Sequence, residues 1–355
     1  MTARVLSIGV CSLAVLLGAA PSLLADEAVF PGKSWATKTP HEVGLSETSL
    51  AEMSRYVGGF GCVVRHGYLV HGWGAVDLRK DVASCCKPWF THFLFKALEQ
   101  GKIASVDERI LPLEPRLESL NAELGHKDRA ISWRHLANQI SCYGVRERPG
   151  EAYDYSDFNM ALFFDTLFYT VYHSTPEKTT ADVLEPMLTN VLGCQDAPRF
   201  DVRGRLAISP RDFCRFGLLY LREGNWNGRQ LLSRDHLHTI LHSPLANSIP
   251  RTKGEKSEMI AGQRSLGGGS NQTDHLGSYS WAWWTNGVDR HGARHWPTAP
   301  EDTFAALGHA GKRALVVIPS LDLIVSWNDS AITTREMETR ALGILVVGCS
   351  KAPQD

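Results

Sequence analysis

The chain has 355 residues, 43% of them apolar, which is enough to bury one large core and argues against disorder or a coiled coil. Its 37 basic and 38 acidic residues are spread along the sequence and nearly cancel. This balance excludes the basic footprint of a nucleic-acid-binding protein and a charged face for a membrane surface. We therefore expect a small-molecule partner, with no nucleic acid and no membrane contact beyond an N-terminal leader.

The N-terminus has the layout of a secretory signal peptide. An apolar run from Val5 to Leu24 is followed by Ala25 and then by acidic residues from Asp26. We expect residues 1–25 to be a signal peptide cleaved near Ala25, and the protein to be exported to the periplasm or secreted. Because the run is near the length of a spanning helix, an uncleaved anchor is the alternative.

Neither the cysteines nor the histidines form a metal-binding pattern. Seven cysteines follow the leader, an odd and scattered set without Cys-x-x-Cys pairs, which predicts small buried side chains and at most one disulfide. The pairs His238/His242 and His291/His295 have helical spacing, but neither has the glutamate of a zinc-binding helix. We expect no metal and no cofactor.

An amphipathic helix and a hairpin open the mature chain. Ser46 is a good N-cap for a helix over 46–56. Strand-forming residues fill 61–65 and 68–73, and the dipeptide His66-Gly67 between them suits a tight turn. The apolar side of the predicted helix consists of Leu50, Met53 and Val57.

Helical signals then dominate from 84 to 275 without a competing strand run, and strand signals return afterwards. A final helix is predicted over 331–347. The fold class expected is α/β (α+β): a central antiparallel sheet built from N- and C-terminal segments (26–83 and 276–355), flanked by helices, with a mostly helical inserted region (84–275), together forming one domain. The late strands are predicted over 279–286, 304–310, 313–318 and 321–327.

The tetrad Ser84-Cys85-Cys86-Lys87 leads directly into a helix predicted to end at Gly101. Ser84 would lie at the helix N-terminus, and Lys87, three residues on, would share its face. A serine hydroxyl needs a base to become a nucleophile, and a desolvated lysine amine can act as one. A Ser-x-x-Lys spacing arises by chance about once in a chain of this length, so the tetrad alone is weak evidence.

Several segments resemble, in order and spacing, the serine β-lactamase and penicillin-binding-protein superfamily. The resemblance is to the class C β-lactamase-like hydrolases, which include carboxylesterases, D-aminopeptidases and 6-aminohexanoate-dimer hydrolases. It implies a β-lactamase/transpeptidase-like fold with Ser84 as nucleophile and Lys87 beside it. The matching segments are Val63-Val-Arg-His-Gly-Tyr-Leu-Val, Asp81-Val-Ala-Ser-Cys-Cys-Lys-Pro, Leu98-Glu-Gln-Gly-Lys and Val106-Asp-Glu-Arg-Ile.

The family's second motif is Tyr-x-Asn, and Tyr155-Ser156-Asp157 stands in its place. Tyr155 matches the catalytic tyrosine. Asp157 replaces the usual asparagine, which puts the contact to a substrate amide in doubt. A carboxylate near Lys87 would favour its ammonium form, so Tyr155, with its ionisation favoured by that cation, would be the better proton acceptor. The alternative for Tyr155 is ordinary aromatic packing.

The third motif is Lys-Thr-Gly in β-lactamases and often His-x-Gly in their esterase-like relatives, and His309-Ala310-Gly311 resembles the second form. It lies on a predicted strand, where Gly311 would let substrate approach. The resemblance implies that the backbone N–H groups of Ser84 and Lys312 form an oxyanion hole. The alternative for His309 is a purely structural strand histidine.

Trp283 is the candidate for an apolar wall of the cleft, with core packing as the alternative. The motifs together predict a serine hydrolase that cleaves an ester, an amide or a short peptide through an acyl-enzyme on Ser84. Because His309 replaces a fixed cation, an esterase-like or amidase-like enzyme is expected before a dedicated β-lactamase. The alternatives are a catalytically silent binding or sensory module, and a true β-lactamase or D-peptidase.

Overall fold

A seven-stranded sheet forms the centre of the computed structural model, which describes residues 28–349; the predicted signal peptide lies outside the described residues. The strand order is β2-β1-β12-β11-β10-β9-β8, and each neighbouring pair is antiparallel. The strands are β1 Phe60–Arg65, β2 Tyr68–Trp73, β8 Tyr279–Ser280, β9 Trp283–Thr285, β10 Phe304–Gly308, β11 Arg313–Ile318 and β12 Leu323–Asn328.

N-terminal and C-terminal segments pair within this sheet, as predicted from the sequence. β1 pairs with β12 from Phe60 opposite Asn328 to Arg65 opposite Leu323. Side chains alternate between the two faces, because successive residues of a strand point in opposite directions. Val63 therefore joins the core on one face and Cys62 and Val64 the core on the other.

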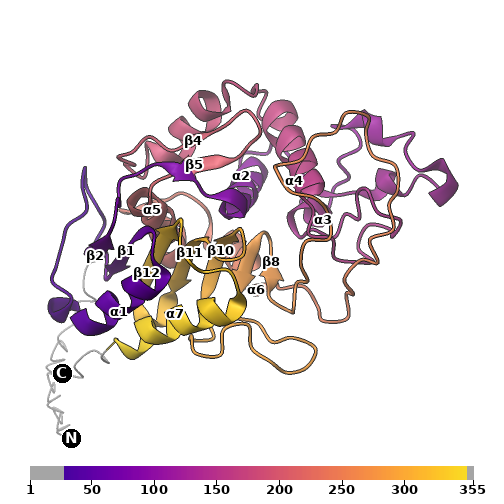
Figure 1. The fold of residues 1–355 in the computed structure, drawn as a ribbon. Helices are drawn as coiled ribbons and strands as arrows, with labels where there is room; N and C mark the ends of the chain where they lie inside the picture. The colour runs from indigo at the N-terminus through magenta and orange to yellow at the C-terminus, as the bar shows by residue number, and fades with distance from the viewer. Residues whose placement is uncertain (1–27, 350–355) are drawn as a thin grey trace, which may run out of the picture.

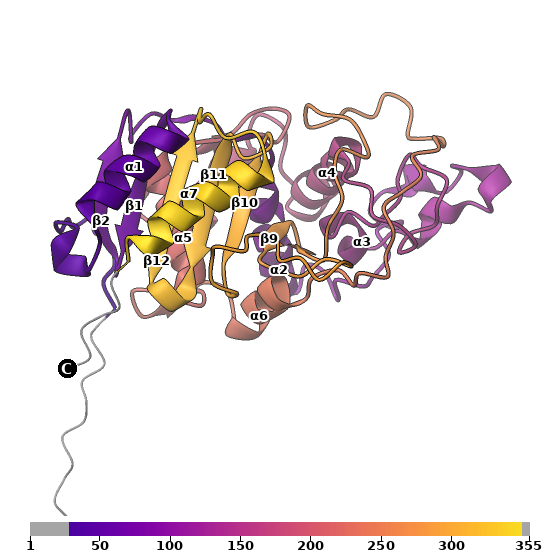
Figure 2. The same cartoon turned by 60° about the horizontal axis from the view of Figure 1, so that its bottom comes forward.

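Helices cover both faces of the sheet (Figures 1 and 2). α1 and α7 lie side by side across one face, and α5 lies against β1, β11 and β12 on the other. Ser46 caps α1 by accepting a hydrogen bond from Ser49 N at 3.2 Å, as predicted. The α-helices are α1 Glu47–Val57, α2 Lys87–Glu99, α3 Trp133–Ala137, α4 Asp157–Phe164, α5 Pro210–Leu221, α6 Arg234–His242 and α7 Arg335–Val347.

The inserted region is less uniformly helical than predicted. It carries most of a small three-stranded sheet, in the order β3-β5-β4, and a two-stranded hairpin. Two π-helical segments, 165–171 and 180–189, extend its helical part. These strands have only two or three residues each, too few for the pattern that identifies a strand in sequence. They are β3 Lys80–Asp81, β4 Arg199–Phe200, β5 Leu206–Ile208, β6 Asn225–Trp226 and β7 Arg229–Gln230.

Three of the late elements differ from their predicted form. The stretch 279–286 is not one strand but a hairpin, because Trp281 and Ala282 adopt positive φ angles of 48° and 70° and turn the chain between β8 and β9. β10 ends at Gly308, so the segment after it is a turn. The last helix begins at Arg335, capped by the Thr334 side chain, rather than at 331.

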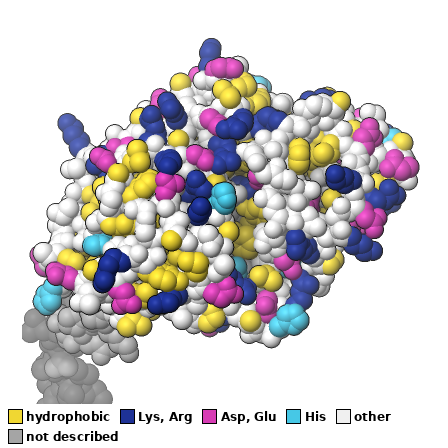
Figure 3. Space-filling model, in the orientation of Figure 1, with side chains coloured by type: hydrophobic (Ala, Val, Ile, Leu, Met, Phe, Trp, Pro, Cys, Tyr) yellow, Lys and Arg dark blue, Asp and Glu magenta, His cyan; other side chains and the backbone are white. Residues whose placement is uncertain are grey.

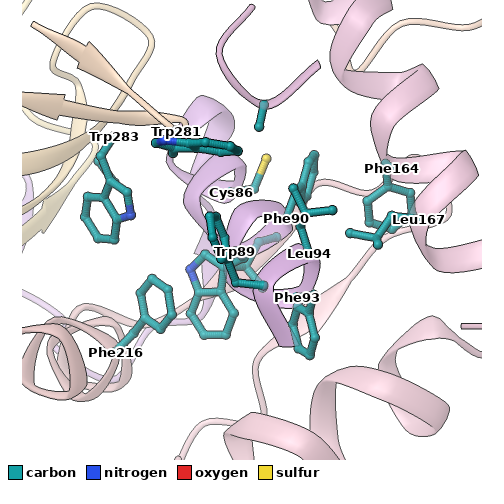
Figure 4. Close-up of a cluster of buried hydrophobic side chains, with 14 of the residues drawn as sticks. Cys86, Trp89, Phe90, Phe93, Leu94, Phe164, Leu167, Phe216, Trp281 and Trp283 are labelled. Atoms are coloured by element: carbon teal, nitrogen blue, oxygen red, sulfur yellow. The ribbon is translucent and has the colours of Figure 1, made fainter. Parts of the chain in front are cut away.

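An aromatic core fills the space between α2 and the surrounding helices (Figure 4). Trp89 of α2 stacks on Phe216 of α5 with ring centroids 4.1 Å apart, and Phe90 packs against Phe164 at 5.0 Å. Burial of these large rings on both sides holds α2, and with it the residues just before its first turn.

Within residues 28–349, no helix is long and apolar enough to cross a membrane. The same range contains no group of three or more His, Cys, Asp or Glu placed to hold a metal ion, and its seven cysteines are all unbridged. On the face shown in Figure 3, positive and negative side chains are interspersed.

Candidate functional site

A cavity of about 590 Å³ brings the predicted motifs together. Ser84, Tyr155 and Asp157 line it together with the turn after β10 and the start of α7. Chain segments that are far apart in sequence therefore share one pocket, next to the sheet edge where β10 is incompletely paired.

Ser84 lies in a single 3-10 turn, Ala83–Cys86, that runs directly into α2. Lys87 Nζ donates a hydrogen bond to Ser84 Oγ at 3.0 Å, so the two side chains share a face as the spacing predicted. Ala83 has φ of 51°, in the left-handed region that costs energy for a residue with a side chain. The strained backbone of Ala83 sets the direction in which the chain continues from β3 into the turn that carries Ser84.

Lys87 is buried and surrounded by the second motif. Its Nζ lies 2.7 Å from Asp157 Oδ1 and 3.8 Å from the centre of the Tyr155 ring. A buried ammonium needs a counter-charge, and Asp157 supplies it while the aromatic face adds a cation–π contact. The carboxylate expected near Lys87 is therefore in direct contact with it.

Tyr155 packs edge to face against Tyr279 and roughly parallel to Trp284, and it is almost fully buried. Burial, together with the charge of Asp157, raises the pKa of Tyr155 well above its usual value, although a hydrogen bond with Ser84 opposes this. From the sequence, the neighbouring cation was expected to favour ionisation of Tyr155. The structure gives the opposite direction for its pKa, because burial and the Asp157 carboxylate outweigh the hydrogen bond with Ser84.

Both carboxylate oxygens of Asp157 contact other groups of the protein. Gly268 N donates to Oδ2 at 2.7 Å, while Oδ1 faces Lys87. Its position at the first residue of α4 is also favourable for a carboxylate, because the helix N-terminus is positive. A Cβ at Gly268 would lie 2.6 Å from Oδ2, so a glycine is needed where the loop 267–269 closes over Asp157.

Arg205 and Asp81 form a clamp that the motifs did not reveal. Arg205 binds Asp81 with two nitrogens, Nε at 2.9 Å and Nη2, and its Nη1 donates to Leu266 O at 3.4 Å. Asp81 Oδ1 also accepts from Ala83 N at 3.2 Å, which fixes the strained residue before Ser84. Burial would raise the pKa of Asp81, but Arg205 outweighs it and the pKa is lowered. The partners are 124 residues apart, a pairing that no local pattern encodes.

The glycine of the third motif that approaches the nucleophile segment lies three residues earlier than predicted. Gly308, not Gly311, approaches the nucleophile: a Cβ on Gly308 would lie 2.4 Å from Val82 O and 3.3 Å from Ala83 Cβ. A Cβ on Gly311 would instead meet Glu338 and Ile332 on the other side of the hairpin. The close approach therefore belongs to Ala306-Leu307-Gly308.

His309 and Lys312 both lie in this turn rather than on the strand. Lys312 N donates to His309 O at 3.3 Å, which closes the turn and takes the Lys312 N–H away from the pocket. β9 pairs with β10 only at Phe304 and Ala305, so the edge of β10 that continues to His309 is open. The His309 side chain is exposed on the pocket rim, where its Nδ1 lies 3.3 Å from Arg313 Nη1.

Trp284 lines the pocket, and Trp283 does not. Trp283 is fully buried and stacks on Phe216 with ring centroids 5.9 Å apart, as Figure 4 shows. Trp283 therefore has the core-packing role that was the alternative for it, and its neighbour on β9, Trp284, forms the cavity wall.

The cysteines that follow Ser84 point into the protein. Cys85 Sγ donates to Ala306 O at 3.4 Å, and Cys86 packs among the aromatic side chains of Figure 4. Burial raises the pKa of Cys85 well above its usual value and that of Cys86 to about 12. Both are neutral packing groups that leave the pocket to Ser84.

Known proteins share this fold at low sequence identity. A protein provisionally named as a 6-aminohexanoate-dimer hydrolase, from Bacillus anthracis, aligns with a TM-score of 0.61 and 12% identity over 90% of this chain and 89% of that one. A β-lactamase from Mycobacterium bovis aligns with a TM-score of 0.57 and 14% identity over 84% and 97%. The fold is that of the serine β-lactamases and penicillin-binding proteins.

The same β-lactamase-type fold is found in EstCE1, described as a hydrolase with promiscuous acyltransferase activity, which aligns with a TM-score of 0.54 and 13% identity over 88% of this chain and 97% of that one. No protein-family model matches the sequence, and no curated protein matches it. The predicted fold is confirmed, and the roles of the site residues stay predictions.

Proposed function

We propose that the protein is a serine hydrolase that cleaves an ester or amide bond through an acyl-enzyme on Ser84. The observation that carries the proposal is the contact of Lys87 Nζ with Ser84 Oγ at 3.0 Å, inside a pocket that Tyr155 also lines. Nucleophile activation requires such a proton-accepting group within hydrogen-bond reach. Structural relatives named as a hydrolase of 6-aminohexanoate dimers, a β-lactamase and a hydrolase with acyltransferase activity support acyl transfer as the reaction class.

In the proposed reaction, Ser84 Oγ attacks the carbonyl carbon and loses its proton to the network of Lys87, Tyr155 and Asp157. The same network returns a proton to the leaving alcohol or amine. Tyr155 stays neutral between steps, because its pKa is raised, and acts by passing a proton along rather than as a standing phenolate. Water then attacks the acyl-enzyme and restores the free serine.

The proposed oxyanion hole consists of the backbone N–H groups of Ser84 and His309. His309 replaces the predicted Lys312 because it follows Gly308, the residue that touches the nucleophile segment, while the Lys312 N–H closes the turn. Two backbone donors aimed at the developing negative charge lower the barrier by about 3 kcal/mol each in comparable sites. The proposed pocket wall is Trp284 in place of Trp283.

The test is covalent labelling with a fluorophosphonate and with a fluorescent penicillin, on the wild-type protein and on Ser84→Ala. We expect labelling of the wild-type protein and none of Ser84→Ala, with Ser54→Ala on α1 labelled like wild type. Equal labelling of Ser84→Ala contradicts the nucleophile assignment. A folded wild-type protein that no probe labels favours instead a binding module in which the Lys87–Asp157 ion pair holds the site inactive.

Substrate preference follows from the same measurements. Rates with short p-nitrophenyl esters, with nitrocefin and with D-amino-acid amides separate esterase, β-lactamase and amidase activity. We expect the esters or amides to be turned over faster than nitrocefin, because no fixed cation occupies the His309 position. We also propose export, on the basis of the apolar run before Ala25, which mass determination of the mature N-terminus tests.

A further inference from the structure

The pocket also contains two buried polar side chains that no part of the proposed reaction uses. Glu338 of α7 is 5% exposed and His295 is 5% exposed, and both line the pocket. Glu338 Oε2 accepts a hydrogen bond from Trp296 Nε1 at 2.9 Å. His295 Nδ1 is buried without a hydrogen-bond partner within the described residues.

An acidic side chain is rarely buried without a cation. Within residues 28–349, no lysine or arginine forms an ion pair with Glu338. Arg335, one turn earlier on α7, also lines the pocket without pairing to it. Glu338 therefore lines the cavity as a carboxylate without an ion-pair partner among the described residues.

Aromatic side chains form one part of the pocket wall beside His295. His295 stacks on Trp284 with ring centroids 5.4 Å apart, and Trp284 in turn lies against Tyr155 beside Ser84. Leu307 also lines the pocket. A ligand that fits this shape has an apolar or aromatic body and a compact donor at its far end.

We infer that the pocket binds a primary ammonium group of the substrate at Glu338, which acts as its counter-charge. The inference rests on the proposed function, because it makes Glu338 a specificity residue of the Ser84 site. An ammonium group offers donors to the carboxylate, and its charge compensates the buried negative charge. A carboxylate ligand would instead meet the acceptor oxygens of Glu338.

Other charged groups near Glu338 set the conditions of the test. Arg335 and Glu336 flank it on α7, and His295 and His309 line the same pocket. Burial raises the pKa of Glu338 to about 7 and lowers that of His295 to about 3. Glu338 is thus ionised above neutral pH, and ammonium binding should strengthen from pH 6 to pH 8.

The experiment measures binding of three probes of equal size, benzylamine, benzyl alcohol and benzoate, to the Ser84→Ala protein by calorimetry or NMR titration. Because Ser84→Ala does not turn over, the result does not depend on the proposed catalysis. We expect benzylamine to bind at least about tenfold more tightly than benzyl alcohol at pH 8, with a smaller preference at pH 6. Benzoate should bind most weakly.

Two variants made on Ser84→Ala complete the design. Glu338→Gln keeps the size of the side chain and its bond to Trp296 but removes the charge, and should abolish the preference for benzylamine. Glu336→Gln, an exposed neighbour with the same change of charge, should retain it. If Glu338→Gln does not fold, the pH dependence of the parent protein decides. Equal affinities, tighter benzoate, no benzylamine binding or an unchanged Glu338→Gln overturns the inference.

Discussion

Lys87 and Asp157 form a buried ion pair, with Nζ and Oδ1 2.7 Å apart, at the residue on which the proposed nucleophile depends. The same ammonium also donates to Ser84 Oγ. The pair stabilises the charged form of Lys87, whereas proton acceptance from Ser84 requires its neutral form. The site therefore keeps its serine oriented but holds back the most direct base.

Asp157→Asn tests this restraint. An asparagine can still accept from Gly268 N, so the loop 267–269 should stay in place, while the negative charge beside Lys87 is lost. We expect the rising limb of the pH–kcat/KM profile to move towards lower pH. The measurement is ester hydrolysis from pH 5 to 10. A limb that stays in place would show that the proton leaves Ser84 by another route.

Residues near one another in sequence were predicted well. The Ser84/Lys87 contact follows from one helical turn, the His66-Gly67 turn from its dipeptide, and α1 from its cap and apolar face. These features depend on local geometry, which a sequence pattern carries directly. The sheet that joins both ends of the chain was inferred from where strand signals occur.

Features set by packing between distant segments could not be predicted. The Arg205–Asp81 clamp joins two short strands, and the hairpin of β8 and β9 depends on a turn at two residues with positive φ. One signal was present and overlooked. Glu338 occupies the same helical face as Ala341, Leu342 and Leu345, and a carboxylate on an apolar face suggests a buried site.

The Arg205–Asp81 clamp should govern the rate of acylation. Arg205→Gln removes the double contact to Asp81 and the tie to Leu266 O, which frees both the residue before Ser84 and the loop that binds Asp157. We expect kcat to fall by about tenfold or more with a smaller change in KM, because a small displacement of a nucleophile is costly. Arg205→Lys, which retains one contact, should recover part of the rate.

Arg203→Gln is the matched control for the clamp, since Arg203 is exposed and pairs only with nearby Asp201 among the described residues. Thermal unfolding of all three variants separates rate effects from stability. If kcat falls only in proportion to the loss of stability, and Arg205→Lys does not restore it, the clamp stabilises the fold and does not position Ser84.

Gly308→Ala tests the corrected third motif. The new methyl group would lie 2.4 Å from Val82 O, a backbone atom, so β10 or the Ser84 turn must shift. The proposed N–H donors of Ser84 and His309 would then no longer converge on one oxygen, and kcat should fall by about a hundredfold. Gly32→Ala, where nothing lies within 4 Å of the added carbon, should have normal kinetics. Full activity of Gly308→Ala would instead support the original assignment of the third motif to His309-Ala310-Gly311.

Glu338 should also make stability depend on pH, apart from any ligand. Burial raises its pKa from 4.5 to about 7 in the folded protein. Between these values the unfolded chain releases the proton that the folded protein retains, so the free energy of unfolding should fall as pH rises through this window. Glu338→Gln removes this contribution, worth about 3 kcal/mol at pH 8 and almost nothing at pH 4. Urea unfolding at pH 4 and pH 8 measures this contribution. At pH 8 the free energy of unfolding of Glu338→Gln should exceed that of wild type, and that of Glu336→Gln should not. If the wild-type and Glu338→Gln curves stay parallel, Glu338 is not held protonated by its burial, and its carboxylate already has a compensating partner in the folded protein.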